Sequence, residues 1–183
     1  MEYSVSTLKT NTIQAATGTT INVTSGQVFT APGHVLQVKQ GTDTTGTSST
    51  STSYVSGGLL VQITPTSTSS KILVSFSAAG HSNTAAKFII VDIARDPSSA
   101  TSVGTALSGG TLLSGKGASG YGLAQEYNQG GGGISQLNAQ VLDSPSTTSQ
   151  VTYLCVFRAH DSGTAHFNVN AGFASITAME IAQ

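Results

Sequence analysis

The stretch KILVSFSAA, residues 71–79, decides the fold of this chain. Its apolar side chains Ile72, Val74, Phe76 and Ala78 share one face, and more polar residues occupy most of the other. This period-two alternation predicts a β-strand with one buried face. No window of eleven or more residues has the 3.6-residue spacing of an amphipathic helix, so the chain is expected to be all-β.

A second stretch, QVTYLCVFR at residues 150–158, is apolar on both faces, which is typical of a central strand covered on both sides. Shorter stretches with strand character recur between loops rich in Gly, Ser, Thr and Pro. They lie at residues 35–40, 59–64, 87–94, 111–113, 122–126, 134–142, 166–170 and 175–182. This pattern predicts an antiparallel, jelly-roll-like β-sandwich over residues 35–183.

Residues 1–34 have too few apolar side chains to fold alone, because ordering each backbone residue costs roughly 1–2 kcal/mol. We interpret them as an extended N-terminal arm that buries its sparse apolar residues against another chain or stays flexible. Three copies could bury such a stripe along a common axis, so a homotrimer is expected. The residues assigned to docking or to the trimer axis are Val5, Leu8, Ile13, Ile21 and Val23.

The chain is unusually poor in charge. Only 8% of its 183 residues are charged, against about 25% in a typical domain, whereas it contains 26 Ser, 26 Thr and 21 Gly. Two explanations stay open. Hydroxyl groups could supply the solubility, or much of the surface is buried in a homo-oligomer, where charge would cost desolvation. The arm favours the second explanation.

The same composition excludes several partners. A net charge of −1 gives no footprint for nucleic acid or an anionic membrane. The longest apolar stretch, residues 88–93, is interrupted by Asp92 and is far shorter than the ~20 residues of a membrane span, so no membrane insertion is expected. The N-terminal sequence MEYSVSTLKT lacks the apolar core of a signal peptide.

No catalytic or cofactor site is expected. The histidines His34, His81, His160 and His166 form no metal-binding pair with helical spacing, and no metal is predicted. The one arrangement left open is a metal held on a trimer axis by symmetry-related copies of His160 or His166. Four glycines at residues 130–133 lack the Lys-Ser/Thr of a phosphate-binding loop. The lone cysteine, Cys155, is expected to be an inert core thiol.

The segment SGKGASGYGLAQEYNQGGGG, residues 114–133, has the chemistry of a binding loop. Tyrosine offers stacking area and a hydroxyl at low entropic cost, and amide side chains match saccharide hydroxyls. The alternative is a long loop packed against a neighbouring subunit. The candidate receptor-binding residues are Tyr121, Gln125, Glu126, Tyr127 and Asn128.

Several stretches, spread over nearly the whole chain, resemble short structural proteins of marine tailed bacteriophages. They are STLKTNTIQ (6–14), PGHVLQV (32–38), TPTSTSSKILV (64–74), LDSP (142–145), VTY (151–153) and SITAMEIAQ (175–183). Residues 95–135 are the most idiosyncratic part, where recognition loops are expected.

The resemblance implies a non-enzymatic component of the virion, made in the host cytoplasm and commonly a β-rich trimer. The favoured role is a tail-fibre or receptor-binding subunit that docks to other virion proteins by its arm and presents the β domain to the host surface, where a glycan is a candidate receptor. The alternative is a capsid-decoration or head-fibre protein. A polysaccharide-degrading spike is disfavoured, since such enzymes need paired carboxylates and a longer chain.

Overall fold

The computed structural model describes residues 31–98, 102–117, 120–130, 133–169 and 172–183. The predicted arm residues Val5, Leu8, Ile13, Ile21 and Val23 lie outside these ranges. The described residues belong to one compact unit, Ala31–Gln183. They form eleven strands: β1 (Val35–Asp43), β2 (Thr47–Ser49), β3 (Val55–Ile63), β4 (Lys71–Ser82), β5 (Phe88–Arg95), β6 (Thr111–Leu112), β7 (Ala124–Tyr127), β8 (Ser135–Asp143), β9 (Val151–Ala159), β10 (Ala165–Phe167) and β11 (Ala174–Ile181).

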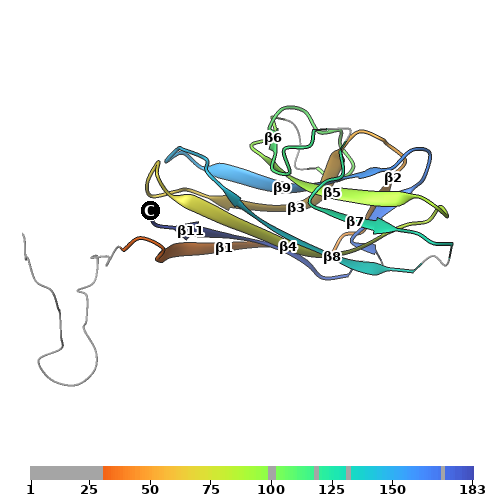
Figure 1. The fold of residues 1–183 in the computed structure, drawn as a ribbon, viewed down its shortest axis with the longest axis horizontal. Coiled ribbons are helices and arrows are strands. Elements are labelled where there is room, and N and C mark those ends of the chain that lie inside the picture. The colour runs from red at the N-terminus through yellow and green to blue at the C-terminus, as the bar shows by residue number, and fades with distance from the viewer. Residues whose placement is uncertain (1–30, 99–101, 118–119, 131–132, 170–171) are drawn as a thin grey trace, which may run out of the picture. The chain divides into compact units, whose positions relative to one another are not determined.

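The strands form two antiparallel sheets that lie face to face along the long axis of the domain (Figure 1). Sheet A has the order β1-β11-β4-β8, with β10 continuing the β11 edge of β4 and β2 pairing with β10. Sheet B has the order β3-β9-β5, and β7 and β6 pair with successive parts of the remaining edge of β5. The predicted antiparallel β-sandwich is confirmed.

The alternation at residues 71–79 continues through the whole of β4. Ile72, Val74, Phe76 and Ala78 are at most 4% exposed and fill the core between the sheets, while the residues between them are partly exposed. Burial of the apolar set is what fixes the register of β4, because a shift by one residue would turn every side chain to the other face.

Strand β9 is covered on both faces, as its sequence predicts. Tyr153, Cys155 and Phe157 face the main core, whereas Leu154 and Val156 belong to a second cluster on the outer side of sheet B. The second cluster packs against partly buried residues of the segment between β5 and β7, including Leu107 and Leu112. That long segment therefore has an apolar anchor of its own.

Two local features were not predicted from the sequence. Strand β2 lies inside a run of polar residues, and it pairs with β10 without contributing an apolar side chain. Strand β1 passes so close to β3 that a Cβ atom at Gly41 would overlap the carbonyl oxygen of Leu60. Only glycine fits this approach of one backbone to another.

An ionic cluster joins the two sheets at one end of the sandwich. Arg95 Nη1 at the end of β5 donates to both carboxylate oxygens of Asp143 at the end of β8, at 2.8 and 2.9 Å. Tyr153 on β9 donates its hydroxyl to Asp143 Oδ2 at 2.8 Å. Burial, followed by the hydrogen bond to Asp143, raises the pKa of Tyr153, so the phenol stays protonated and keeps donating.

We expect Asp143→Ala to lower the free energy of unfolding by about 3 kcal/mol, because it leaves the Arg95 cation and the Tyr153 hydroxyl without their acceptor. Urea unfolding followed by circular dichroism measures the change. The matched control is Asp161→Asn, which removes the charge of a carboxylate that is 59% exposed and paired with Lys87, and keeps a residue type that tolerates the left-handed backbone at this position. It should cost less than about 0.5 kcal/mol. Equal losses in both variants would contradict the assigned role of Asp143.

Candidate functional site

The candidate site begins with a row of three rings on the outer side of sheet B. Phe88 opens β5 and is the register partner of Tyr127, the last residue of β7, and their ring centres are 4.7 Å apart. On the other side of Phe88, the backbone N–H of His160 donates to the Phe88 carbonyl oxygen at 3.0 Å. The His160 and Phe88 rings meet edge to face at 5.3 Å. Strand pairing therefore places the three rings side by side.

Tyr121 completes the group from the segment between β6 and β7. Its ring meets Phe88 edge to face at 5.6 Å and lies nearly parallel to the His160 ring, with centres 6.1 Å apart. Tyr121 and Tyr127 are 53% and 44% exposed. We name Phe88, Tyr121, Tyr127 and His160 the aromatic platform.

Two neighbouring glycines fix the backbone at Tyr121. The Gly120 carbonyl accepts a hydrogen bond of 2.8 Å from Nη2 of Arg158, whose guanidinium lies 5.6 Å from the centre of the Tyr54 ring. On the other side, a Cβ atom at Gly122 would overlap the carbonyl oxygen of Val91. Tyr121 is thus held against sheet B by a buried arginine and by direct backbone packing, so the exposed ring does not have to be ordered when a ligand binds.

The rim of the platform carries the charges of this end of the domain. Asp161 Oδ2 lies 3.3 Å from Lys87 Nζ and 3.1 Å from His160 Nδ1. Asp161 has a φ of 56°, a left-handed conformation that turns the chain from β9 toward β10. Stacking faces, phenol hydroxyls and a charged rim together suit a ring-shaped polar ligand with one apolar face, such as a saccharide.

The five predicted binding residues divide into two groups. Tyr121 and Tyr127 meet in the platform, and Gln125 is exposed and two residues before Tyr127 on β7, so it faces the same side. Glu126 points the other way and accepts from the backbone N–H of Ser82 at 3.0 Å. Asn128 is 3% exposed and bonds through its amide to Ser82 and Gly130. Glu126 and Asn128 therefore position the loops instead of reaching a ligand.

Sequence reasoning missed Phe88 and the role of His160. In the sequence, Phe88 is one of several apolar residues of a strand, and His160 is only a candidate metal ligand. Their meeting depends on the register between β5 and β7 and on the turn after β9, which no local pattern encodes.

The other chemistry-bearing residues are dispersed or buried. In the described ranges no group of three or more His, Cys, Asp or Glu side chains lies together. Cys155 is fully buried, as expected, and burial followed by the charge of Asp92 raises its pKa. Burial also raises the pKa of Asp92, against hydrogen bonds from Ser114 and from the Ile93 backbone. Asp92 ties the segment after β6 to β5, because both the backbone and the hydroxyl of Ser114 donate to it.

In comparisons with known proteins, no protein-family model matches the chain, and no curated protein aligns significantly with it. Within the described residues, no helix has the length and apolar character needed to cross a membrane.

His81 and His166 stack on each other on sheet A. They are register partners on β4 and β10, and their rings stack with centres 4.6 Å apart. Burial, followed by the neighbouring His81, lowers the pKa of His166. The folded state thus resists a proton that the unfolded chain accepts, so stability is full above about pH 6.5 and is lost as the pH falls through the folded pKa.

We expect the melting temperature to fall between pH 7 and pH 5, and the fall to be smaller in His166→Phe, which keeps a ring to stack on His81 and removes the titrating group. Scanning calorimetry across this range tests the expectation. Ser75→Ala, a non-titrating substitution on the same face of β4, is the control and should keep the wild-type slope. A His166→Phe profile that superimposes on the wild type would exclude the pair as a source of the pH dependence.

Proposed function

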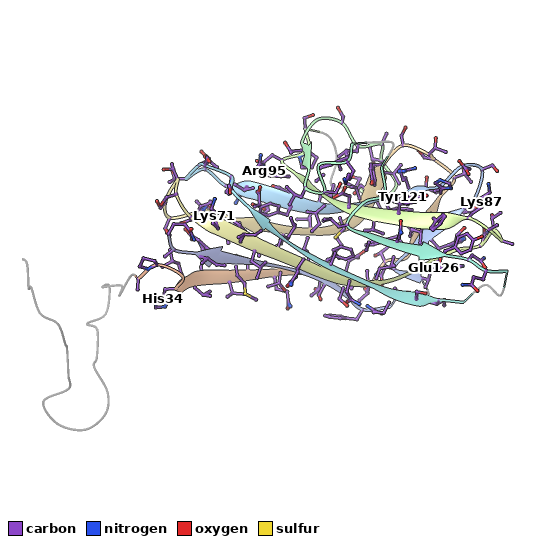
Figure 2. All side chains as sticks on the ribbon, in the orientation of Figure 1. His34, Lys71, Lys87, Arg95, Tyr121 and Glu126 are labelled. Carbon is purple, nitrogen blue, oxygen red and sulfur yellow. The ribbon has the colours of Figure 1, made fainter. Side chains whose placement is uncertain are left out.

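We propose that this chain is a structural subunit of a bacteriophage virion, a tail-fibre or receptor-binding appendage whose aromatic platform binds a glycan of the host surface. The observation that carries the proposal is the separation of two ends along the strands. Figure 2 places His34, where the chain enters the domain, at one end, and Tyr121, Lys87 and Glu126 toward the other. An appendage needs this arrangement, since attachment and recognition must not compete for the same surface.

The attachment end is well anchored. The backbone N–H of Gly33 donates to the carbonyl of Ala182 at 2.8 Å, and the N–H of Ala182 donates to the carbonyl of His34 at 2.9 Å. A force applied to the preceding segment therefore acts along the paired strands β1 and β11, and many hydrogen bonds between them bear it together. This supports a role for residues 1–34 as the arm that docks to other virion proteins.

The fold supports the same role. From the strand order β1-β11-β4-β8 facing β3-β9-β5-β7 we infer a jelly-roll-like fold, an architecture that recurs in viral capsid proteins and in lectins. The sequence resemblance to marine phage structural proteins points in the same direction. In the proposed homotrimer three platforms would act together, and multivalency raises the apparent affinity of a weak site by orders of magnitude.

We expect Tyr121→Ala and Tyr127→Ala each to weaken binding roughly ten-fold or more, because each removes an exposed stacking face. The purified full chain is passed over a panel of immobilised bacterial envelope polysaccharides in a biosensor. Val103→Ala, an exposed apolar residue outside the platform, is the matched control and should bind as the wild type does. Melting temperatures of all variants verify folding.

Two outcomes would contradict the receptor-binding role: a wild-type chain that binds no polysaccharide of the panel, or a double tyrosine variant that binds as tightly as the wild type. Gold labelling of intact particles locates the subunit, and label on the head would favour capsid decoration. Release of reducing sugar from a bound polysaccharide would overturn the non-enzymatic assignment.

A further inference from the structure

The outward face of sheet A carries an apolar row that crosses all four main strands. Val38 on β1 pairs with Met179 on β11, Met179 pairs with Leu73 on β4, and Leu73 pairs with Leu142 on β8. The row is open to solvent at both ends, since Val38 is 53% and Leu142 is 56% exposed. Isolated exposed apolar residues are ordinary, but four in register across a sheet form a contiguous patch.

The next rows along the strands are polar and uncharged. In order from β1 to β8 they are Gln40, Thr177, Ser75 and Gln140, and then Thr42, Ser175, Ser77 and Asn138. The three rows together contain no ionisable side chain. An equally uncharged surface can cover these rows without desolvating a charge.

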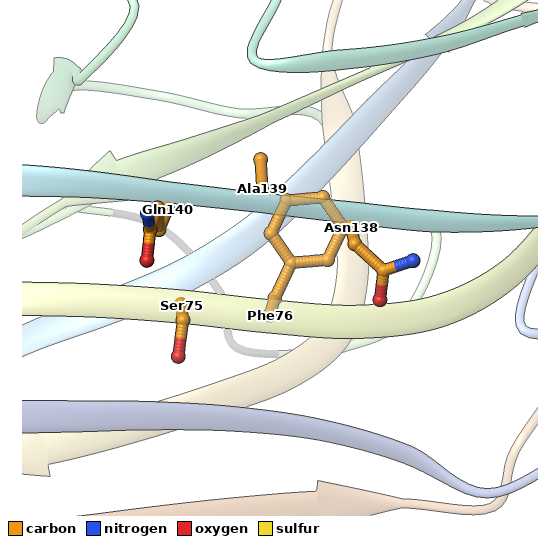
Figure 3. Close-up of a pocket in the computed structure, with 5 residues that line it drawn as sticks. All are labelled: Ser75, Phe76, Asn138, Ala139 and Gln140. Atoms are coloured by element: carbon orange, nitrogen blue, oxygen red, sulfur yellow. The ribbon is translucent and has the colours of Figure 1, made fainter.

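The face is also hollowed beside the apolar row. A shallow depression of about 410 Å³ is lined by Ser75, Phe76, Asn138, Ala139 and Gln140. Figure 3 shows the Phe76 ring lying between the ribbons of β4 and β8, near the small side chain of Ala139. Leu142 projects two residues along β8 from Gln140, so one face offers both an apolar projection and a hollow.

The chain entry point lies at the same end as the apolar row. The thirty residues that precede the described domain join it at Ala31, four residues before β1 and seven before Val38. Their sparse apolar side chains are the ones expected to pack between copies. The strand that carries Val38 is therefore the first strand of the domain after that segment.

We propose that the outward face of sheet A is the interface between copies of this chain, with the row Val38–Met179–Leu73–Leu142 as its apolar centre. The two exposed ends of the row lie on opposite edge strands, β1 and β8. In a closed ring of copies, the Val38 edge of one copy meets the Leu142 edge of the next. That the ring has three members rests on the proposed function, whereas the surface itself does not.

The first test uses sedimentation of the full chain at micromolar concentration. The wild type should sediment as a closed oligomer of the 18.5 kDa chain, and Leu142→Glu should weaken association roughly a hundred-fold, because it places a carboxylate in the apolar row of the interface. Leu142 is exposed in the single copy, so the circular dichroism spectrum should not change. Val103→Glu, at an exposed apolar site on the segment between β5 and β7, is the matched control and should stay assembled.

The second test is independent of the arm, which could hold copies together even when the face is disrupted. The native Cys155 is fully buried, so engineered cysteines would be the only reactive thiols at the surface. The double variant Val38→Cys and Leu142→Cys should form disulfide-linked oligomers under mild oxidation, whereas the single variants should not.

A monomeric wild type, or a Leu142→Glu chain that stays assembled together with an unlinked double-cysteine variant, would overturn the proposal. A single Leu142→Cys variant that links to itself would overturn the Val38-to-Leu142 arrangement. Neither result touches the polysaccharide measurements on Tyr121 and Tyr127, so failure of the interface and failure of the receptor-binding role can be told apart.

Discussion

The alternation along β4 is the constraint on which the rest of the structure depends. This strand pairs on one edge with β11 and then β10, and on the other edge with β8, so its register sets the register of sheet A. Four inward side chains close the core, and that requirement alone decides which residues point outward. The apolar row, the uncharged rows beyond it and the stacked histidines are therefore all consequences of how the core is filled.

Four charged residues of this domain are buried in its interior. Asp92, Asp143, Arg158 and Glu180 are all at most 9% exposed. Burial opposes ionisation of Glu180, but hydrogen bonds, of which that from Gln37 is the largest, outweigh it and hold its pKa below the usual range. Its carboxylate accepts from Gln37 and from Thr66, and so fastens the loop between β3 and β4 to sheet A. The chain has few charged residues, and those that hold a loop or join the sheets do not contribute charge to the surface. The outer faces are therefore more neutral than the composition suggests.

The sequence was sufficient for most of the strands and insufficient for the surfaces. Strand positions follow from alternation, which is local, and the two-sided burial of β9 follows from its continuous apolar run. Strand β2 escaped detection because Thr47–Ser49 contains no apolar residue, and its place is decided by pairing with β10. The candidate site could be predicted only in part. Two tyrosines in a glycine-rich segment indicate a binding loop. The direction of the Glu126 side chain and the positions of Phe88 and His160 beside the tyrosines depend on the register between distant strands.

The two outer faces of the sandwich differ in how far the described chain covers them. Sheet B is covered by the segment between β5 and β7, and that covering holds Tyr121 in place through Arg158 and Gly122. The three rows of sheet A have no such cover from the described chain, although they include Val38 and Leu142, two of its most exposed apolar residues. A folded chain tolerates an uncovered neutral face only if its hydroxyls and amides keep it in solution or if something else covers it. Since the apolar row ends on both edge strands, hydroxyls elsewhere do not protect those edges, and the proposed neighbouring copy would cover them at no cost in charge desolvation.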